Sequence, residues 1–426
     1  MHEYLSRLLE QLSDKLHMLW TRLGGASGAE EPEPVYALPR PDHADKLTIP
    51  VCEAAADETA QREAQARGQF LARQERWDDL IDEIRNADKA RAATPGGAPI
   101  AELLAFGARS DVVLAAEHAL QEGKPAADAP LLTGIKALET VRRESPADPY
   151  LSLIVALAHL DLGWAWRGTG WDAALPQLNR NRCIAHFDRA RDLLAPYDGV
   201  DLDSPLIASA HCALLAGRRD ARSRVSGDYE ALIDLDPNNP RHMRALGYHL
   251  LPRWFGSYDE LELQARRTAA RTQAIWGSGG YTWVCFDAIG IDEDACAKVD
   301  VGFFIEGLKD IAMARPEQEM INLLAAYCAV VIRQGLGAST EADLARLQIA
   351  DCAYWLVREH LTEVHPMVWA HALDGFDNNI RVSSVNRFAA RGRRSALQAI
   401  GDLFREEIAQ GCHVTFTAEG PRLDPA

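Results

Sequence analysis

Arginine and tryptophan occur together in a short segment at residues 164–171, WAWRGTGW, which also contains two glycines. The residues that could bind a ligand are Trp164, Trp166, Arg167 and Trp171. A guanidinium group binds a carboxylate through two parallel hydrogen bonds, and neighbouring indole rings supply an apolar surface. The segment could therefore bind the acidic terminus of a peptide or another anion.

A second segment of this kind, PRWFGSY at residues 252–258, places Arg253 and Trp254 just before Gly256. Both segments have a structural alternative, in which they are turns between paired helices. In that case the tryptophans pack in the core, and the arginines donate to carbonyl groups at the ends of helices. The sequence favours this alternative, but the two segments are still its best candidates for a binding site.

Three histidines lie close together in the segment HLTEVHPMVWAH, which contains His360, His365 and His371 and has Glu363 between the first two. A helical zinc-protease motif needs two histidines four residues apart, with a glutamate directly after the first. Here the first two are five residues apart, which turns them about 140° from each other on a helix, and Pro366 interrupts the segment. The sequence therefore predicts no metal site and no cofactor.

The remaining motifs predict no reaction. The acidic segment at residues 287–300 lacks the spacing of an EF-hand loop, and the glycines at residues 277–280 lack the lysine and hydroxyl of a P-loop. A Gly-x-Ser-x-Gly motif is also absent from the sequence. Catalytic triads assemble in space rather than in sequence, so the alternative function is an enzyme of unknown reaction, with a pocket near the two arginine–tryptophan segments.

Residues 3–23 are predicted to form an amphipathic helix with one continuous leucine seam. The leucines recur at intervals of 4, 3, 4, 3 and 4 residues, the heptad pattern of a helix that packs along another helix. Acidic and basic residues balance here, whereas a helix on a membrane surface usually carries a basic excess. The helix could fold back on its own domain, dock on a partner or self-associate. The seam consists of Leu5, Leu9, Leu12, Leu16, Leu19 and Leu23.

Three further regions follow this helix. Residues 24–50 are rich in proline and glycine, which predicts an extended linker that tethers the helix. Residues 51–409 have helical periodicity with frequent breaks and no alternation of strand and helix, which predicts one all-α domain of stacked antiparallel helix pairs. Residues 410–426 form a tail that is either disordered or one short strand over residues 412–417, with no second strand nearby to pair with.

The stretch from residue 229 to residue 261 resembles the tetratricopeptide repeat. In that family an aromatic residue eight positions before a proline ends one repeat, and Tyr229 and Pro237 match this pattern. A Leu-Gly pair opens the next repeat, and Leu246 and Gly247 match it. The glycine lies where two helices cross closely, and larger side chains fill the adjacent spaces.

The second helix of that repeat is matched by Gly256, Tyr258 and Leu261 if two residues are inserted near Pro252. A weaker copy of the pattern runs through residues 68–87. The resemblance implies a TPR-like α-solenoid of degenerate repeats that binds a protein or peptide partner. The weaker copy comprises Gly68, Leu71, Trp77, Leu80, Ile84 and Ala87.

The composition excludes several classes of function. The 426 residues include 45 lysines and arginines against 62 aspartates and glutamates, a net charge of −17 that argues against nucleic-acid binding. A membrane span requires about 18 apolar residues without charge, and the sequence contains no such stretch. Its eight cysteines are scattered, and Glu3 lies where a secretory signal would be basic, so we expect a cytoplasmic protein. The sequence therefore predicts a non-catalytic interaction scaffold or adaptor.

Overall fold

Helices dominate the computed structural model, which confirms the prediction of an all-α chain. Within the part of the chain that the structure describes, no helix is both long and apolar enough to cross a membrane. The predicted leucine seam, most of the predicted linker and Trp171 lie outside the described residues. The structure describes residues 44–52, 56–121, 129–145, 147–168, 175–337, 339–376 and 384–425.

The described residues divide into two compact units, whereas the sequence analysis expected a single helical domain over residues 51–409. The first unit comprises residues 56–242 and 252–256, and the second comprises residues 44–52, 243–251 and 257–425. The boundary falls within helix α10 (Pro240–His249) and the turn that follows it. Helical periodicity continues through this boundary, so the sequence pattern could not reveal it.

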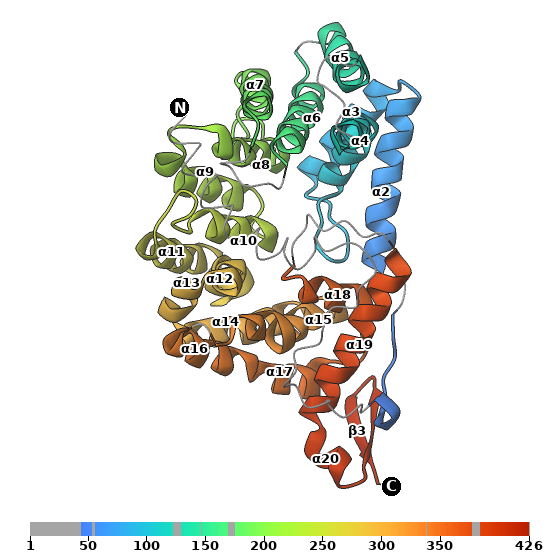
Figure 1. Ribbon diagram of the computed structural model, residues 1–426, viewed down its shortest axis with the longest axis vertical. Coiled ribbons are helices and arrows are strands. Elements are labelled where there is room, and N and C mark those ends of the chain that lie inside the picture. Colours follow the sequence, from blue (N-terminus) through green and yellow to red (C-terminus); the bar gives the residue numbers. More distant parts are fainter. Residues whose placement is uncertain are drawn as a thin grey trace. The chain divides into compact units, whose positions relative to one another are not determined.

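The first unit is built around helix α6 (Pro149–Arg167), which is apolar on nearly every side. The Asp148 side chain begins this helix by accepting a hydrogen bond from the Leu151 backbone N–H, and Pro149 occupies the first position, where no N–H donor is needed. Helix α6 packs against α4 and α7 (Figure 1). The helices of this unit are α2 (Ala56–Arg73), α3 (Trp77–Lys89), α4 (Ile100–Gln121), α5 (Ala129–Glu144), α6, α7 (Gln177–Leu194), α8 (Pro205–Leu214), η3 (Leu215–Gly217) and α9 (Ala221–Leu235).

A buried carboxylate joins three helices of the first unit. Asp88, in the last turn of α3, accepts hydrogen bonds from the Tyr150 hydroxyl (3.0 Å), the Leu206 backbone N–H (3.0 Å) and the Ser204 hydroxyl. Burial raises the pKa of Asp88, and the hydrogen bonds oppose that rise. Because its partners lie at the beginnings of α6 and α8, this carboxylate fixes how the three helices pack.

The second unit has the aromatic helix α12 (Gly279–Ile291) at its centre, in contact with α11 and α14. Phe286 of α12 stacks on Tyr327 with ring centroids 3.8 Å apart, and the Tyr327 hydroxyl donates to the Phe286 carbonyl (2.8 Å). Two segments, η4 and η6, are π-helical. The other elements are α11 (Tyr258–Trp276), α13 (Glu293–Lys298), α14 (Val301–Ala314), α15 (Gln318–Ala326), η4 (Tyr327–Val331), η5 (Ile332–Gly335), α16 (Thr340–Ala350), α17 (Cys352–Trp355), η6 (Leu356–His360), α18 (Pro366–Leu373), α19 (Val385–Leu403) and α20 (Arg405–Ala409).

Two glycines that the sequence analysis placed at helix crossings do lie at such crossings. A Cβ atom on Gly68 of α2 would lie 2.1 Å from the Leu104 carbonyl oxygen of α4. A Cβ atom on Gly247 of α10 would lie 1.7 Å from the Val284 carbonyl oxygen of α12. Both distances are far shorter than a carbon–oxygen contact allows, so only glycine fits at either crossing.

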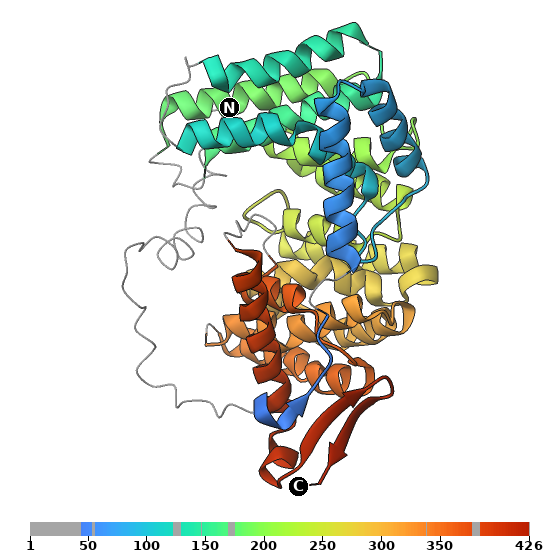
Figure 2. The ribbon, with the colours of Figure 1, turned by 90° about the vertical axis from the view of Figure 1, so that its right-hand side faces the viewer.

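The C-terminal tail forms a small sheet. The predicted strand is present as β2 (His413–Thr417), and it pairs antiparallel with β3 (Gly420–Asp424), so disorder was the wrong alternative for these residues. Its other edge pairs parallel with β1 (Leu47–Thr48), which follows the short helix η1 (Ala44–Lys46). Figure 2 shows the red hairpin with the blue segment beside it. The sequence analysis expected no strand to pair with residues 412–417. Neither partner is recognisable in the sequence, because β1 has only two residues and β3 begins with Gly-Pro, which is typical of a turn.

Candidate functional site

The first arginine–tryptophan segment lies in the last turn of α6. Trp164 packs edge-to-face on Phe187 of α7, with ring centroids 5.5 Å apart, and Trp166 is buried in the core of the first unit. The buried Arg167 guanidinium donates to the Gly168 carbonyl (3.0 Å) at the end of the helix. These contacts match the structural alternative, and the binding of an anion by this segment stays a prediction.

The second arginine–tryptophan segment lies in the turn between α10 and α11. Arg253 and Trp254 are half-buried there, and the Trp254 ring lies 5.6 Å from that of Phe255. The two segments therefore come from different helix ends, one after α6 and the other before α11. Ligand binding by this segment also stays a prediction.

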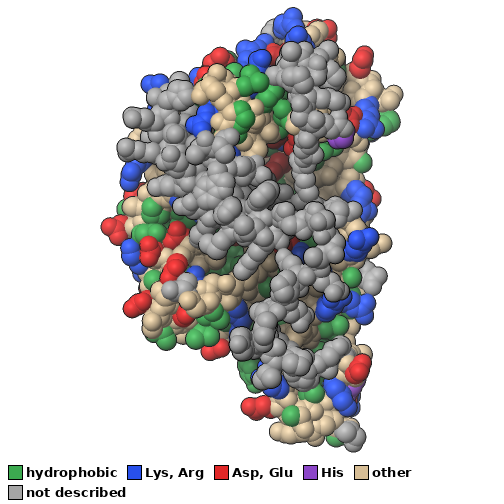
Figure 3. Space-filling model, in the orientation of Figure 1, with side chains coloured by type: hydrophobic (Ala, Val, Ile, Leu, Met, Phe, Trp, Pro, Cys, Tyr) green, Lys and Arg blue, Asp and Glu red, His purple; other side chains and the backbone are tan. Residues whose placement is uncertain are grey.

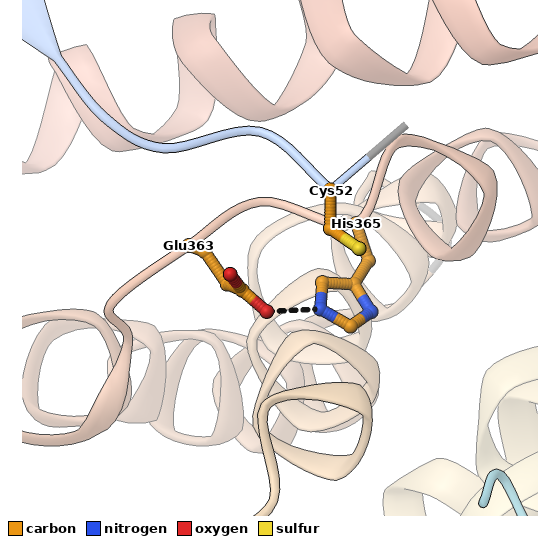
Figure 4. A group of neighbouring side chains, drawn as sticks. All are labelled: Cys52, Glu363 and His365. Atoms are coloured by element: carbon orange, nitrogen blue, oxygen red, sulfur yellow. Dashed lines mark hydrogen bonds and ion pairs between the residues drawn. The ribbon is translucent and has the colours of Figure 1, made fainter. Parts of the chain in front are cut away.

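A third group of side chains, which the sequence analysis did not bring together, lies in the second unit (Figure 4). Cys52, Glu363 and His365, called the Cys52 cluster below, each offer one sulfur, oxygen or nitrogen atom, and these three atoms lie within 4.8 Å of one another. The Nε2 atom of His365 lies 3.0 Å from the Glu363 carboxylate. His365 is buried, whereas the other two are half-buried. The group therefore combines a thiol, an imidazole and a carboxylate at the surface of the unit.

The opposite edge of the His365 ring is held by a second carboxylate. Its Nδ1 atom lies 2.6 Å from a carboxylate oxygen of Glu319 on α15. Burial lowers the pKa of His365, but the hydrogen bonds and charges of Glu319 and Glu363 outweigh burial and raise the pKa above its ordinary value. Both ring nitrogens are thus engaged, and the plane of the ring is fixed.

Two amide side chains of α15 fix the loop that carries Glu363 and His365. The Gln318 amide donates to the His360 carbonyl (2.8 Å), and its oxygen accepts from the Thr362 backbone N–H (2.8 Å). The fully buried Asn322 donates to the Glu363 carbonyl (2.9 Å) and accepts from the His365 backbone N–H (2.9 Å). The loop is therefore tied to α15 along its whole length.

Cys52 reaches this loop from a distant part of the sequence. Its backbone N–H donates to the Val364 carbonyl (2.9 Å), and the Val364 N–H donates to the Pro50 carbonyl (2.9 Å). These two hydrogen bonds form a short parallel bridge between Val51 and Val364. The π-helix η6, a kind of segment that is frequent at functional sites, directly precedes the loop.

The structure separates the three histidines that the sequence analysis considered for a metal. His360 packs edge-to-face on Trp355 (5.5 Å between centroids), and His371 packs on Phe388 (4.9 Å). Only His365 joins the Cys52 cluster. Sequence reasoning missed Cys52 and Glu319, because each comes from another segment. The one local signal was Glu363 two residues before His365.

A second titratable group lies in the first unit, between α5, α6 and α7. The Nδ1 atoms of His159 and His186 are 2.8 Å apart, and Nε2 of His159 lies 3.2 Å from the Glu139 carboxylate. Arg189 donates to both oxygens of Glu139, and this hydrogen bonding lowers the pKa of Glu139 to about 2. Burial lowers the pKa of His159 and lowers that of His186 to about 4.

This pair of histidines predicts that the first unit loses stability in mild acid. In the unfolded chain a histidine binds a proton below a pH of about 6.5. His186 has a native pKa of about 4, because burial and the nearby charges of His159 and Arg182 oppose its protonation. Between these two pH values the unfolded state holds a proton that the native state lacks, so the free energy of unfolding falls as the pH falls.

Urea denaturation at several pH values between about 7 and about 4 tests this expectation. We expect His186→Gln to make the loss of stability towards low pH shallower than in the wild type. An unchanged pH dependence in His186→Gln would show that His186 is not protonated on unfolding in this range.

No protein family, curated protein or solved structure matches this chain. The resemblance to tetratricopeptide repeats therefore rests on the residues of the sequence alone.

Proposed function

We propose that the chain is a non-catalytic interaction scaffold, a TPR-like array of helix pairs that binds a protein or peptide partner in the cytoplasm. The close helix crossings at Gly68 and Gly247 support a repeat-like packing. Gly68 belongs to the weaker copy of the repeat pattern, and Gly247 belongs to the stronger one. None of the eight cysteines forms a disulfide, which supports a reducing compartment.

Nucleic acid is not the partner we propose. The net charge of −17 would repel a phosphate backbone. On the face drawn in Figure 3, the basic side chains that are described lie among acidic and apolar ones. A protein surface with mixed charges and apolar side chains is better suited to another protein.

The observation that carries the proposal is an exposed apolar stripe on α16 and α17. Leu344, Leu347 and Tyr354 are 57%, 45% and 52% exposed. Asp351, between the two helices, keeps helical backbone angles (φ −64°, ψ −19°), so the three side chains share one side of a nearly continuous helix, within about 80° of arc. An amphipathic helix can bury such a stripe.

The leucine seam, on the helix predicted for residues 3–23, has the required chemistry. Its intervals of 4 and 3 residues are compatible with the stripe, in which Leu344 and Leu347 are three residues apart and Tyr354 follows Leu347 by one heptad of seven. The partner that we propose for the stripe is thus the leucine seam of a second copy of the chain, so the protein would self-associate.

The test uses a labelled peptide of residues 3–23 and the full-length protein with its own seam disabled by Leu12→Asp and Leu16→Asp. We expect the peptide to bind, as measured by fluorescence anisotropy. Adding Leu344→Asp and Leu347→Asp should weaken binding by about tenfold or more, because each buries a charge in the interface. Leu263→Asp, at an exposed leucine of α11, is the matched control and should leave the affinity unchanged. Equal losses in the stripe and control variants, or no binding to any of them, would contradict the proposal.

A second candidate function, an enzyme on an all-helical scaffold, is favoured by the Cys52 cluster rather than by the arginine–tryptophan segments. The cluster places a thiol, an imidazole and a carboxylate within reach of one small molecule.

A further inference from the structure

We propose that Cys52, Glu363 and His365 form a zinc-binding site, a property that is independent of the interaction role proposed above. The ligands are the Cys52 thiolate, the Glu363 carboxylate and Nε2 of His365. Sulfur, nitrogen and oxygen from these three residue types are the ligands that zinc takes in proteins. A thiolate and a carboxylate together carry two negative charges, which balance the charge of Zn²⁺.

The spacing of the three side chains suits a tetrahedral metal site. With ligands about 2.0–2.3 Å from zinc, tetrahedral geometry places the ligand atoms about 3.3–3.8 Å from one another. In this structure all three ligand atoms lie within 4.8 Å of one another, and His365 Nε2 already lies 3.0 Å from Glu363. The three ligand atoms would have to move to that shorter spacing for a metal ion to bind.

Glu319 gives His365 the second partner that a metal-bound histidine usually has. A histidine that binds a metal through one ring nitrogen almost always donates the N–H of its other ring nitrogen to a carboxylate, carbonyl or water. Nδ1 of His365 lies 2.6 Å from Glu319, which holds a proton on Nδ1. Nε2 faces Glu363 at 3.0 Å, and a metal ion would take the place of the Nε2 proton there. Glu319 is thus a positioning residue and does not itself bind the zinc.

The backbone around the cluster is held before any metal binds. Asn322 fixes the carbonyl of Glu363 and the N–H of His365, and the bridge to Val364 fixes Cys52. A site that is already assembled loses little conformational entropy on binding. The ligand types also exclude the hard cations, because Mg²⁺ and Ca²⁺ bind oxygen and not thiolate.

Three protein ligands leave the fourth position of a tetrahedral zinc ion for water. This is the pattern of catalytic zinc sites, whereas structural sites have four protein ligands. The Glu363 side chain is 38% exposed, so water can reach this ligand from solvent. The site is therefore also the place where the alternative enzymatic function would reside.

The first experiment adds Co²⁺ to metal-free, full-length protein, because Co²⁺ accepts the same ligands and reports thiolate coordination by a charge-transfer absorption band. We expect this band at one equivalent of Co²⁺ and its loss when Zn²⁺ is added. Cys52→Ser should abolish the band, whereas Cys412→Ser, at another half-buried cysteine of the same unit, should retain it. A band that survives Cys52→Ser, or no band in the wild type, would overturn the proposal.

The second experiment tests the positioning role of Glu319 by competition with a coloured zinc chelator. We expect Glu319→Gln to weaken zinc binding by about 10–100-fold, the usual effect of removing such a partner. Circular dichroism and thermal unfolding of the metal-free variant check that it is folded. Zinc affinity equal to that of the wild type in a folded Glu319→Gln protein would overturn the assignment of Glu319.

Alkylation of Cys52 distinguishes a metal ligand from a thiol that is merely reactive. With iodoacetamide and mass spectrometry, we expect Zn²⁺ to protect Cys52 and to leave the alkylation of Cys412 unchanged. Alkylation of Cys52 at the same rate with and without Zn²⁺ would show that the thiol does not bind the metal.

Discussion

Replacing Gly247 by alanine should destabilise the second unit by about 3 kcal/mol or more, since overpacking of a tight contact costs about 1–3 kcal/mol and more where backbone must move. The added methyl group would lie 1.7 Å from the Val284 carbonyl oxygen, and that atom belongs to the backbone of α12, which cannot rotate away as a side chain would. The helices α10 and α12 would have to separate. Urea denaturation of the purified variant measures the loss.

Helix propensity alone predicts that Gly→Ala raises the free energy of unfolding, so a control glycine without close neighbours should change in the opposite direction. In an exposed helix, Gly→Ala stabilises by about 0.5–1 kcal/mol. Gly227, on the exposed side of α9, has no atom within 4 Å of an added Cβ, so we expect Gly227→Ala to gain stability by this amount. If Gly247→Ala were as stable as the wild type, α10 and α12 would not cross at this glycine.

Helix crossings could be predicted from the sequence because the pattern that encodes them is local. Gly68 and Gly247 each lie in a window of spaced apolar residues, and that spacing already specifies a helix with a small residue on its buried face. The sheet could not be predicted in this way. β1 consists of Leu47 and Thr48 alone, and it pairs with residues at the far end of the chain. Such a pairing depends on the tertiary fold rather than on any local pattern.

The candidate site was missed for a related reason. The arginine–tryptophan segments are conspicuous because their unusual residues are adjacent in sequence. In the structure Trp166 packs in the core, and Arg167 donates to a carbonyl at the end of a helix. The Cys52 cluster is inconspicuous in sequence, because Cys52, Glu319 and His365 come from three separate segments. Residues that converge on a site only after folding carry no signal in their spacing.

Replacing Asn322 by alanine should have the second large effect, and it should affect both stability and the zinc site. Asn322 is fully buried, and its oxygen accepts from the His365 backbone N–H and from the Trp369 indole N–H (2.8 Å). Its amide also donates to the Glu363 carbonyl. Alanine would leave two buried N–H groups and the partly buried Glu363 carbonyl without their partner, and each buried group costs about 1–3 kcal/mol. We expect a loss of about 3 kcal/mol or more in the free energy of unfolding, measured in urea.

Gln334→Ala is the matched control, because Gln334 also caps carbonyl groups with its amide but does so at the surface. It donates to the Ala372 and Leu373 carbonyls (3.1 and 3.0 Å) and is exposed, so water can replace it. We expect this variant to lose no more than about 0.5 kcal/mol. Equal losses in the two variants would show that burial of the amide network does not stabilise the loop.

The same Asn322→Ala variant separates the proposed zinc site from the proposed interaction surface. Asn322 holds the backbone of Glu363 and His365 in place, so below its melting temperature the variant should bind zinc more weakly than the wild type. The stripe of Leu344, Leu347 and Tyr354 lies on other helices, so the affinity for the leucine-seam peptide should be retained. Loss of both zinc binding and peptide binding in a protein that is still folded would mean that the stripe and the zinc site are not independent. Retention of full zinc affinity would mean that the loop does not need Asn322 to present its ligands.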